Sequence, residues 1–372
     1  CFPKRVTAAI EPCIVQTAWT DSSYNDTYHL YLENSWDKAM DKMPLTRRAW
    51  VVQELLLPPR VLYLNGRQLF WECYELAACE TYPDGTPPNY RPRGVTKEAK
   101  WQAFISGRIQ LDTTEEHSVS YLWAGIVAMY SKCELTYGTD KLVALSGVAK
   151  LMEQALDDEY CAGLWKSHLI TELSWTGPSG IMNLPLRPSP YRAPSWSWAS
   201  IDGYISVGDS YNKDPYKYLE ALIDIIDCDI QTATADRTGA VVGGSLRVSG
   251  WLASIQLHAD SKSGWRVFFD GKWWDFGGRF YISLDCSPSS LRMHCLPLFA
   301  YCTDSHRGNV YCLLLSPTGN ANGQFQRIGV LYTDPGGLGI EDWTRFRGDI
   351  ENEAWVQYEE LCDNGKGIIS IL

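Results

Sequence analysis

The sequence has little positive charge. Its 33 Lys and Arg residues stand against 44 Asp and Glu, which gives a net charge of -11 at pH 7. Because nucleic-acid binding depends mainly on cationic contacts to phosphate, this balance argues against a nucleic-acid partner. Long apolar runs are absent too. The longest, from Val119 to Tyr130, is interrupted by Ser120 and is well short of the roughly 20 residues that span a bilayer, so we expect no membrane span.

Motifs for metals, nucleophiles and phosphate are missing as well. The 12 Cys include no C-x-x-C pair. A group of Cys and His residues is not at zinc-site spacing: Cys286, His294, Cys295, Cys302 and His306. We therefore predict no metal and interpret the thiols as reduced, in a cytoplasmic protein. There is no G-x-S-x-G, H-E-x-x-H, G-x-G-x-x-G or G-x-x-x-x-G-K-[ST], so we expect no bound cofactor.

What is present is typical of a globular protein of two to three domains. Hydrophobic residues make up 45% of the 372 and charged residues 21%, which excludes a disordered chain, a collagen-like rod and a coiled coil. Thr46 to Leu56 lies between Pro44 and Pro58-Pro59, which favours a short helix. Asn65-Gly66 then separates the apolar runs 60–64 and 67–71, the strongest short hairpin signal.

Helical patterns follow, and strand patterns come last. A Pro-rich linker at 81–93 precedes apolar stripes that predict helices. These are at 119–130, 142–156 and 164–175. After Gly239, β-branched and aromatic runs predict strands at 245–257, 265–269, 272–276, 279–284, 310–315 and 325–332, which favours an antiparallel sandwich or barrel. We predict an α+β protein with domains at 1–82, 83–176 (helical) and 177–372 (β-rich).

Two residues of the first helix are candidates for chemistry. On a helix, Trp50 and Glu54 are four apart and share a face. A carboxylate beside an indole would be partly desolvated, which raises its pKa and suits acid/base work or holding a sugar hydroxyl. Alternatively, Glu54 pairs with Arg47 or Arg60 and Trp50 is a core residue. Spacing alone favours this second interpretation.

A second aromatic pattern lies at Ser195-Trp196-Ser197-Trp198. In a strand both Trp side chains would face one side. They could form a stacking platform for a flat ligand, but such a pattern is more often a seam of the core.

The segment that contains Trp50 and Glu54 resembles the closing motif of the fungal heterokaryon incompatibility (HET) domain. The resemblance rests on Pro44-Leu45-Thr46-Arg47-Arg48-Ala49-Trp50-Val51-Val52-Gln53-Glu54 and on Trp71-Glu72-Cys73, with Cys1-Phe2-x-x-Arg5 before them. Three downstream stretches are similar to further motifs of that family, in the same order: Thr139-Asp140-Lys141-Leu142, Ala162-Gly163-Leu164-Trp165 and Ala193-Pro194-Ser195-Trp196-Ser197-Trp198-Ala199-Ser200.

The resemblance implies a role in self/non-self recognition and regulated cell death through protein–protein contacts, including self-association. It also implies a TIR-like (flavodoxin-like) α/β piece at the start, followed by the helical layer and the antiparallel β-rich domain. The family's opening motifs are absent, and the chain opens at Cys1 without Met, so we expect the N-terminal half of the HET domain to be a missing partner segment.

The resemblance also leaves an enzyme as an alternative. Some TIR domains cleave NAD through a Glu in a Trp-Cys-x-x-Glu helix, and Trp50 and Glu54 have the same spacing, with Val51 in place of Cys. On this hypothesis NAD is the substrate, Glu54 is catalytic and Trp50 forms a wall of the pocket. We further expect the apolar face of the Thr46–Leu56 helix and of the hairpin to be either packed on the helical layer or exposed, because a doubly wound sheet without its central strands loses their cover.

Overall fold

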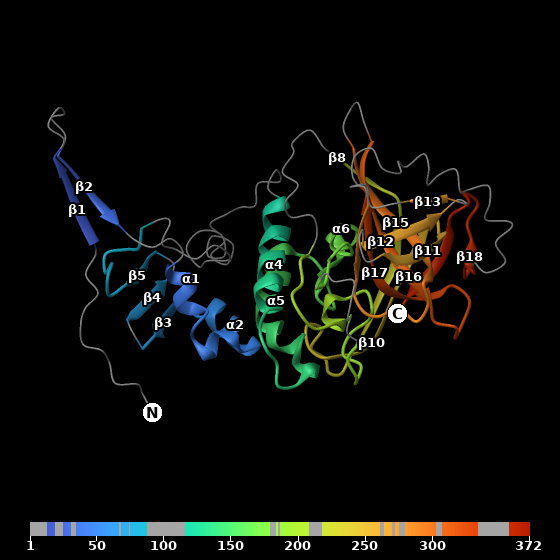
Figure 1. Ribbon diagram of the computed structural model, residues 1–372. Helices are drawn as coiled ribbons and strands as arrows, with labels where there is room; N and C mark the ends of the chain where they lie inside the picture. The colour runs from blue at the N-terminus through green and yellow to red at the C-terminus, as the bar shows by residue number, and fades with distance from the viewer. Residues whose placement is uncertain are drawn as a thin grey trace. The chain divides into compact units, whose positions relative to one another are not determined.

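The computed structural model describes residues 13–18, 25–30, 35–66, 68–73, 75–87, 116–178, 184, 187–207, 218–260, 264–269, 272–274, 280–302, 307–333 and 357–372. The chain divides into two compact units, Cys1–Leu135 and Thr136–Leu372. Both units contain helices and strands, as Figure 1 shows, so the fold is α+β. Within the described residues no helix has the length and apolar character needed to cross a membrane.

The first unit combines short helices with two small antiparallel sheets. Its helices are α1 (Ser35–Met40), α2 (Ala49–Leu56) and α4 (Glu116–Tyr130). Its strands are β1 (Cys13–Ala18), β2 (Asn25–Leu30), β3 (Arg60–Leu64), β4 (Leu69–Cys73) and β5 (Ala77–Cys79). β1 pairs with β2, and the other three form a sheet in the order β3-β4-β5. All these pairs are antiparallel, so the described strands of this unit include no parallel pair of the kind a TIR-like sheet has.

The predicted helix and hairpin are both present. A 3₁₀ helix at Pro44–Arg47 leads into α2, which ends before the two prolines. The predicted hairpin register is corrected, however. Leu64 pairs with Leu69, which leaves a four-residue loop in place of a two-residue Asn-Gly turn. The Asn65 side chain donates a hydrogen bond to the Ala39 carbonyl over 3.2 Å, so it anchors the loop to α1.

The core of the first unit lies on one face of the three-stranded sheet. Tyr63 and Phe70 are cross-strand partners, and Trp36 from α1 packs edge-on against both rings, at centroid distances of 5.9 and 5.0 Å. Edge-to-face pairs of this kind add to the free energy that area burial alone provides. Met40 and Leu55 extend the cluster, which joins α1 and α2 to the sheet.

The second unit begins with short helices. They are α5 (Ser146–Leu156) and α6 (Leu169–Glu172), with 3₁₀ turns at Gly138–Asp140, Val143–Leu145, Lys166–His168 and Trp198–Ser200. The predicted helix over 164–175 is confirmed only in part, because 166–172 is a 3₁₀ turn that runs directly into α6. Its first residues belong to a two-stranded ladder of β6 (Tyr160–Cys161) and β7 (Leu164–Trp165). Ala162 and Gly163 turn this ladder with φ of 48° and 103°, and the chain cannot continue as a helix through them.

One 12-stranded sheet forms the rest of this unit, with the path order β13-β12-β11-β15-β16-β17-β19-β10-β9 and with β14, β18 and β8 paired off that path. Its strands are β8 (Tyr218–Ala221), β9 (Asp224–Thr232), β10 (Val241–Gly250), β11 (Ala253–Asp260), β12 (Gly264–Phe269), β13 (Lys272–Trp274), β14 (Phe280–Leu284), β15 (Arg292–Cys302), β16 (Arg307–Pro317), β17 (Gln324–Thr333), β18 (Glu360–Leu361) and β19 (Gly367–Ile371). Every described pair is antiparallel except β17 with β19. The predicted strand 245–257 is two strands, β10 and β11. Five strands were not predicted: β8, β9, β15, β18 and β19.

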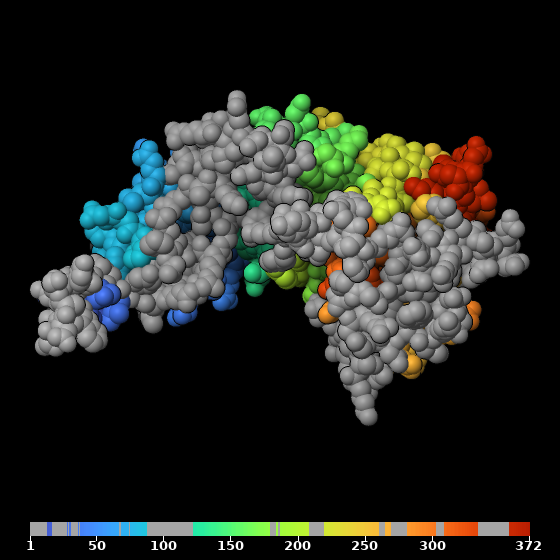
Figure 2. All heavy atoms as spheres, turned by 90° about the horizontal axis from the view of Figure 1, so that it is seen from above, coloured from blue at the N-terminus to red at the C-terminus, as the bar shows by residue number. Residues whose placement is uncertain are grey.

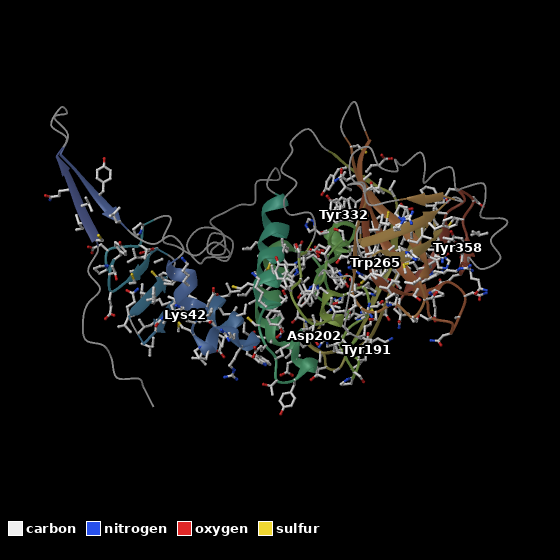
Figure 3. All side chains as sticks on the ribbon, in the orientation of Figure 1. Lys42, Tyr191, Asp202, Trp265, Tyr332 and Tyr358 are labelled. Carbon is white, nitrogen blue, oxygen red and sulfur yellow. The ribbon has the colours of Figure 1, made fainter. Side chains whose placement is uncertain are left out.

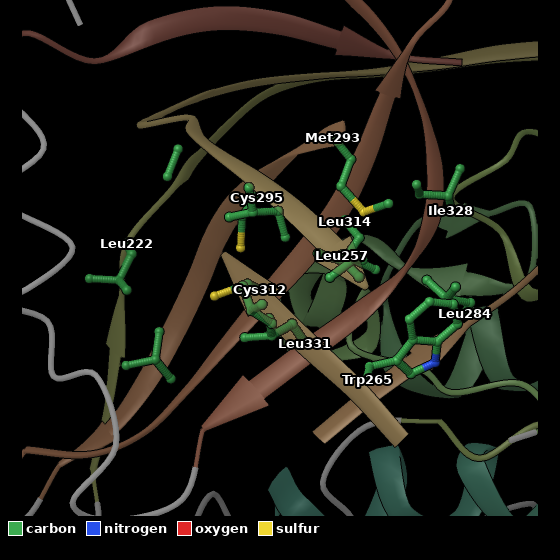
Figure 4. Close-up of a cluster of buried hydrophobic side chains, with 14 of the residues drawn as sticks. Leu222, Leu257, Trp265, Leu284, Met293, Cys295, Cys312, Leu314, Ile328 and Leu331 are labelled. Carbon is green, nitrogen blue, oxygen red and sulfur yellow. The ribbon is translucent and has the colours of Figure 1, made fainter. Parts of the chain in front are cut away.

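Buried apolar side chains cover one side of the central strands. Figure 4 shows this cluster, with Leu257, Met293, Leu314 and Leu331 among its members. The last strand, β19, reaches the centre of the sheet and pairs with β10. In Figure 2 the C-terminal residues, in red, lie at the surface of this unit next to yellow segments.

Candidate functional site

The predicted site helix, α2, contacts α4 and is hydrogen-bonded to the segment that follows α4. The Ala49 N–H donates to the Glu134 carbonyl over 3.0 Å, and the Glu134 N–H donates to the Arg47 carbonyl over 2.6 Å. Ala49, Val52 and Leu56 form the buried side of α2. This is one of the two arrangements expected for the apolar face of the helix, since α4 belongs to the predicted helical layer.

The two predicted site residues lie away from that buried side. Glu54 is exposed and Trp50 is half-buried. The desolvated carboxylate expected beside an indole is not formed here, because α2 turns positions 49, 52 and 56 toward the interior and leaves position 54 in water. No described contact joins Glu54 to a second carboxylate or to a phosphate-binding loop. Its catalytic role stays a prediction.

The hairpin of the first unit carries apolar side chains on both faces. Tyr63 and Phe70 occupy the core face. Leu62 and Leu64 point to the opposite face and are 54% and 59% exposed. On that face Leu62 pairs with Trp71, and Leu64 with Leu69, both half-buried. An antiparallel sheet with one solvated face usually places polar residues there, so this apolar outer face is unusual. We call Leu62, Leu64, Leu69 and Trp71 the outer face.

A buried carboxylate lies on the core face of the same hairpin. The Tyr63 hydroxyl donates to Glu72 over 2.7 Å, and both side chains are buried. Burial, with a smaller contribution from the Glu72 charge, raises the pKa of the Tyr63 hydroxyl well above its usual range. The pair holds the two strands together with a charge-assisted bond. No role was predicted for Glu72, which occurs in the Trp71-Glu72-Cys73 motif. A charged residue between two apolar residues of a strand was the sequence signal that could have indicated this buried pair.

Two of the three downstream motifs are hydrogen-bonded to each other in one core of the second unit, and Lys141 of the third lies 6.0 Å from the centre of the Trp198 ring. The Trp198 indole donates to the Gly163 carbonyl over 2.7 Å, and the Ser197 hydroxyl donates to the Ala162 carbonyl over 2.5 Å. The Trp175 indole donates to the Trp196 carbonyl over 2.8 Å. Trp196 and Trp198 are both fully buried and lie in a turn and a 3₁₀ helix, so the expected strand is wrong here. A stacking platform for a ligand is excluded, and the core interpretation holds.

A buried Arg–Asp pair joins this core to the sheet. Arg327 of β17 and Asp285 are both almost fully buried, and the Arg327 Nε donates to Asp285 over 2.9 Å. The guanidinium also donates to the carbonyls of Leu173 and Trp175 and lies 3.3 Å from the centre of the Trp175 ring. Burial lowers the pKa of Arg327 to about 10, with Asp285 opposing that change, so the guanidinium is still charged at neutral pH.

Another group of charges lies closer to the surface. Arg192 donates from Nη2 to Asp202 over 2.7 Å, and the Lys141 Nζ lies 3.6 Å from the same oxygen and also donates to the Ile201 carbonyl. Lys141 and Arg192 are buried, whereas the Asp202 side chain is exposed. Burial, and then the Arg192 charge, lower the pKa of Lys141 to about 8. Burial alone would raise the pKa of Asp202, but the two cations outweigh it and hold that pKa below its usual value.

Glu172 is the most perturbed carboxyl group in this core. It is 1% exposed and accepts the Trp165 N–H over 2.7 Å, while its Oε1 has no hydrogen-bond partner in the described part of the chain. Burial raises its pKa to about 8, although the bond from Trp165 opposes the change. Glu172 is therefore mostly protonated at neutral pH.

No group of three or more His, Cys, Asp or Glu residues that could hold a metal occurs in the part of the chain that the structure describes. Of the Cys and His residues singled out in the sequence, Cys286, His294, Cys295 and Cys302 are buried, and His306 lies outside the described residues. No family model, curated protein or solved structure matches this chain.

Proposed function

We propose that this chain acts through protein–protein contacts in self/non-self recognition and regulated cell death, as its resemblance to the fungal HET family implies. The observation that carries the proposal is the outer face of the first unit. Leu62 and Leu64 are each more than half exposed on a sheet that already has a packed core on its other side. Exposed apolar patches on a folded domain mark interaction sites.

The contact that we propose is self-association through this outer face. β3 is at the edge of its sheet, so it offers both apolar side chains and a strand edge to a partner. The TIR-like origin of the first unit is part of the same proposal. That part rests on the resemblance alone, because every described strand pair of this unit is antiparallel.

The test replaces both exposed leucines. The double variant Leu62→Ser, Leu64→Ser should fold normally, because neither side chain belongs to the core. We expect it to abolish self-association, measured by light scattering after size-exclusion chromatography, and to abolish cell death when the protein is expressed in a filamentous fungus. The matched control is Leu361→Ser, which changes a leucine that is equally exposed in the second unit. Equal killing by the double variant and by the parent would refute the proposal.

The alternative, NAD cleavage through Glu54, is separable from this one. An enzyme would release nicotinamide from NAD and lose that activity with Glu54→Gln. For a signalling protein we expect killing to persist with Glu54→Gln, because Glu54 is exposed on α2 and changes nothing in the core. Chromatography of the reaction mixture for nicotinamide decides between the two.

A further inference from the structure

Exposed tyrosines lie next to the Lys141–Arg192–Asp202 cluster. Tyr137, Tyr191 and Tyr204 are 68%, 50% and 41% exposed. Tyr191 directly precedes Arg192, and Tyr204 follows Asp202 by two residues. Figure 3 labels Tyr191 and Asp202 on this part of the second unit. Tyr137 precedes Gly138, whose backbone is so close to Arg192 that an added Cβ would lie 2.9 Å from Nη1. We call the three tyrosines with Arg192 and Asp202 the tyrosine platform.

Among the described residues, two polar atoms of the platform have no hydrogen-bond partner. The Asp202 Oδ1 takes both cations, while Oδ2 has no hydrogen-bond partner among the described residues, and the side chain is 67% exposed. Arg192 donates from Nε to the Ala199 carbonyl and from Nη2 to Asp202, which leaves Nη1 without an acceptor in the described part of the chain. An acceptor and a donor therefore lie on neighbouring, ion-paired side chains.

This pair is rigidly held. The Arg192 and Lys141 side chains are each only 5% exposed, and each also binds a carbonyl of the 199–201 turn. That turn follows Trp198, whose indole donates to the Gly163 carbonyl. Trp198 belongs to a fully buried cluster with Trp175 and Trp196, which we call the tryptophan core. Polar groups fixed in this way lose little conformational entropy when a ligand binds.

The arrangement selects against charged ligands of either sign. An anion attracted by Lys141 and Arg192 would meet the exposed Asp202 carboxylate, and a cation attracted by Asp202 would meet the Arg192 guanidinium. A hydroxyl group both donates and accepts, so two neighbouring hydroxyls can donate to Asp202 Oδ2 and accept from Arg192 Nη1 together. The apolar face of a sugar ring also packs well on an exposed tyrosine ring.

We propose that the tyrosine platform binds a neutral carbohydrate, with a vicinal diol held by Asp202 and Arg192 and the sugar ring packed on Tyr191. The site lies wholly within the second unit and does not depend on the outer face of the first. Lys141 is a positioning residue, because it pairs with Asp202 and donates a hydrogen bond to the Ile201 carbonyl.

Saturation-transfer NMR on the full chain tests the proposal, with D-ribose, maltotriose and chitotriose as the probes. At least one of them should receive saturation from the protein. Asp202→Asn and Tyr191→Ala should each weaken that binding by about tenfold, since each removes a direct contact. Tyr281→Ala is the matched control, because Tyr281 of β14 is comparably exposed and outside the platform. It should bind like the parent.

The contrary results are as clear. Failure of all three sugars to bind the folded parent overturns the proposal, and so does unchanged binding by Tyr191→Ala, which does not touch the ion pairs and should fold even if Asp202→Asn does not. Titration with inorganic phosphate, followed by ³¹P line width, gives a third readout. Phosphate binding that is lost in Arg192→Gln would assign an anion site and overturn the sugar assignment.

Discussion

At the residue scale, Glu172 should make the stability of the second unit depend on pH. Its pKa is about 8 in the folded chain, against an ordinary value of 4.5. Between those values the folded state holds a proton that the unfolded chain releases, so the free energy of unfolding falls as pH rises from about 4.5 to 8. At about 1.4 kcal/mol per pKa unit, the total change is a few kcal/mol. Glu172→Gln keeps the shape and removes the titration, and should therefore be more stable than the parent at pH 8.

Urea denaturation at pH 5 and pH 8 measures this difference. The control is Glu360→Gln, because Glu360 is exposed in β18 and its replacement should leave the pH dependence of the parent unchanged. If Glu172→Gln and the parent lose the same free energy between pH 5 and pH 8, the proton is not held at Glu172.

At the element scale, Arg327 joins β17 to Asp285, which follows β14, and to the residues that follow α6. Its guanidinium binds Asp285 and the carbonyls of Leu173 and Trp175, so it replaces water for three buried acceptors. Arg327→Met should lower the free energy of unfolding by about 3–5 kcal/mol, because it leaves Asp285 buried and unpaired. The partly exposed pair of Arg247 and Glu359 provides the comparison, since Arg247→Met should cost under about 1 kcal/mol. Thermal unfolding of both variants measures the two losses of unfolding free energy. Equal losses would show that burial does not make the Arg327–Asp285 pair more important for stability.

Elements with local signals were predicted, and elements that depend on distant contacts were not. Prolines on both sides made α2 predictable, and Asn65-Gly66 made the β3–β4 hairpin predictable. The loop length was missed because Asn65 binds Ala39, a contact invisible in a local pattern. β15 was missed because Pro297 and a run of buried residues hide its alternation, and its register with β16 shifts between Pro297 and Phe299 and again between Ala300 and Cys302.

For the candidate sites, too, local patterns were predictable and contacts between distant residues were not. Spacing correctly placed Trp50 and Glu54 on one helix but could not show which side of α2 faces the core, since that depends on α4 and on the sheet. Lys141, Arg192 and Asp202 are up to 61 residues apart in the chain, and no pattern predicts their contact. A lone charged residue in the mostly apolar stretch 325–332 was a usable sign of the buried Arg327–Asp285 pair.

At the scale of the whole molecule, the two compact units should differ in their dependence on each other. Thr136–Leu372 contains the 12-stranded sheet with its own apolar cluster and the tryptophan core. A unit of this size with a continuous core buries enough surface to fold alone. Residues 136–372 expressed alone should therefore unfold in one cooperative transition, and that transition should keep the pH dependence predicted for Glu172.

The first unit provides the contrast. Its described strands form one three-stranded sheet and one two-stranded hairpin, and its outer face is unprotected. Residues 1–135 alone should therefore aggregate or unfold at a lower temperature than residues 136–372, and Leu62→Ser with Leu64→Ser should reduce that aggregation. Calorimetry and light scattering on the two pieces measure both effects. A first unit that stays monomeric and melts above the second would mean that its outer face needs no partner, and self-association would then have to use another surface.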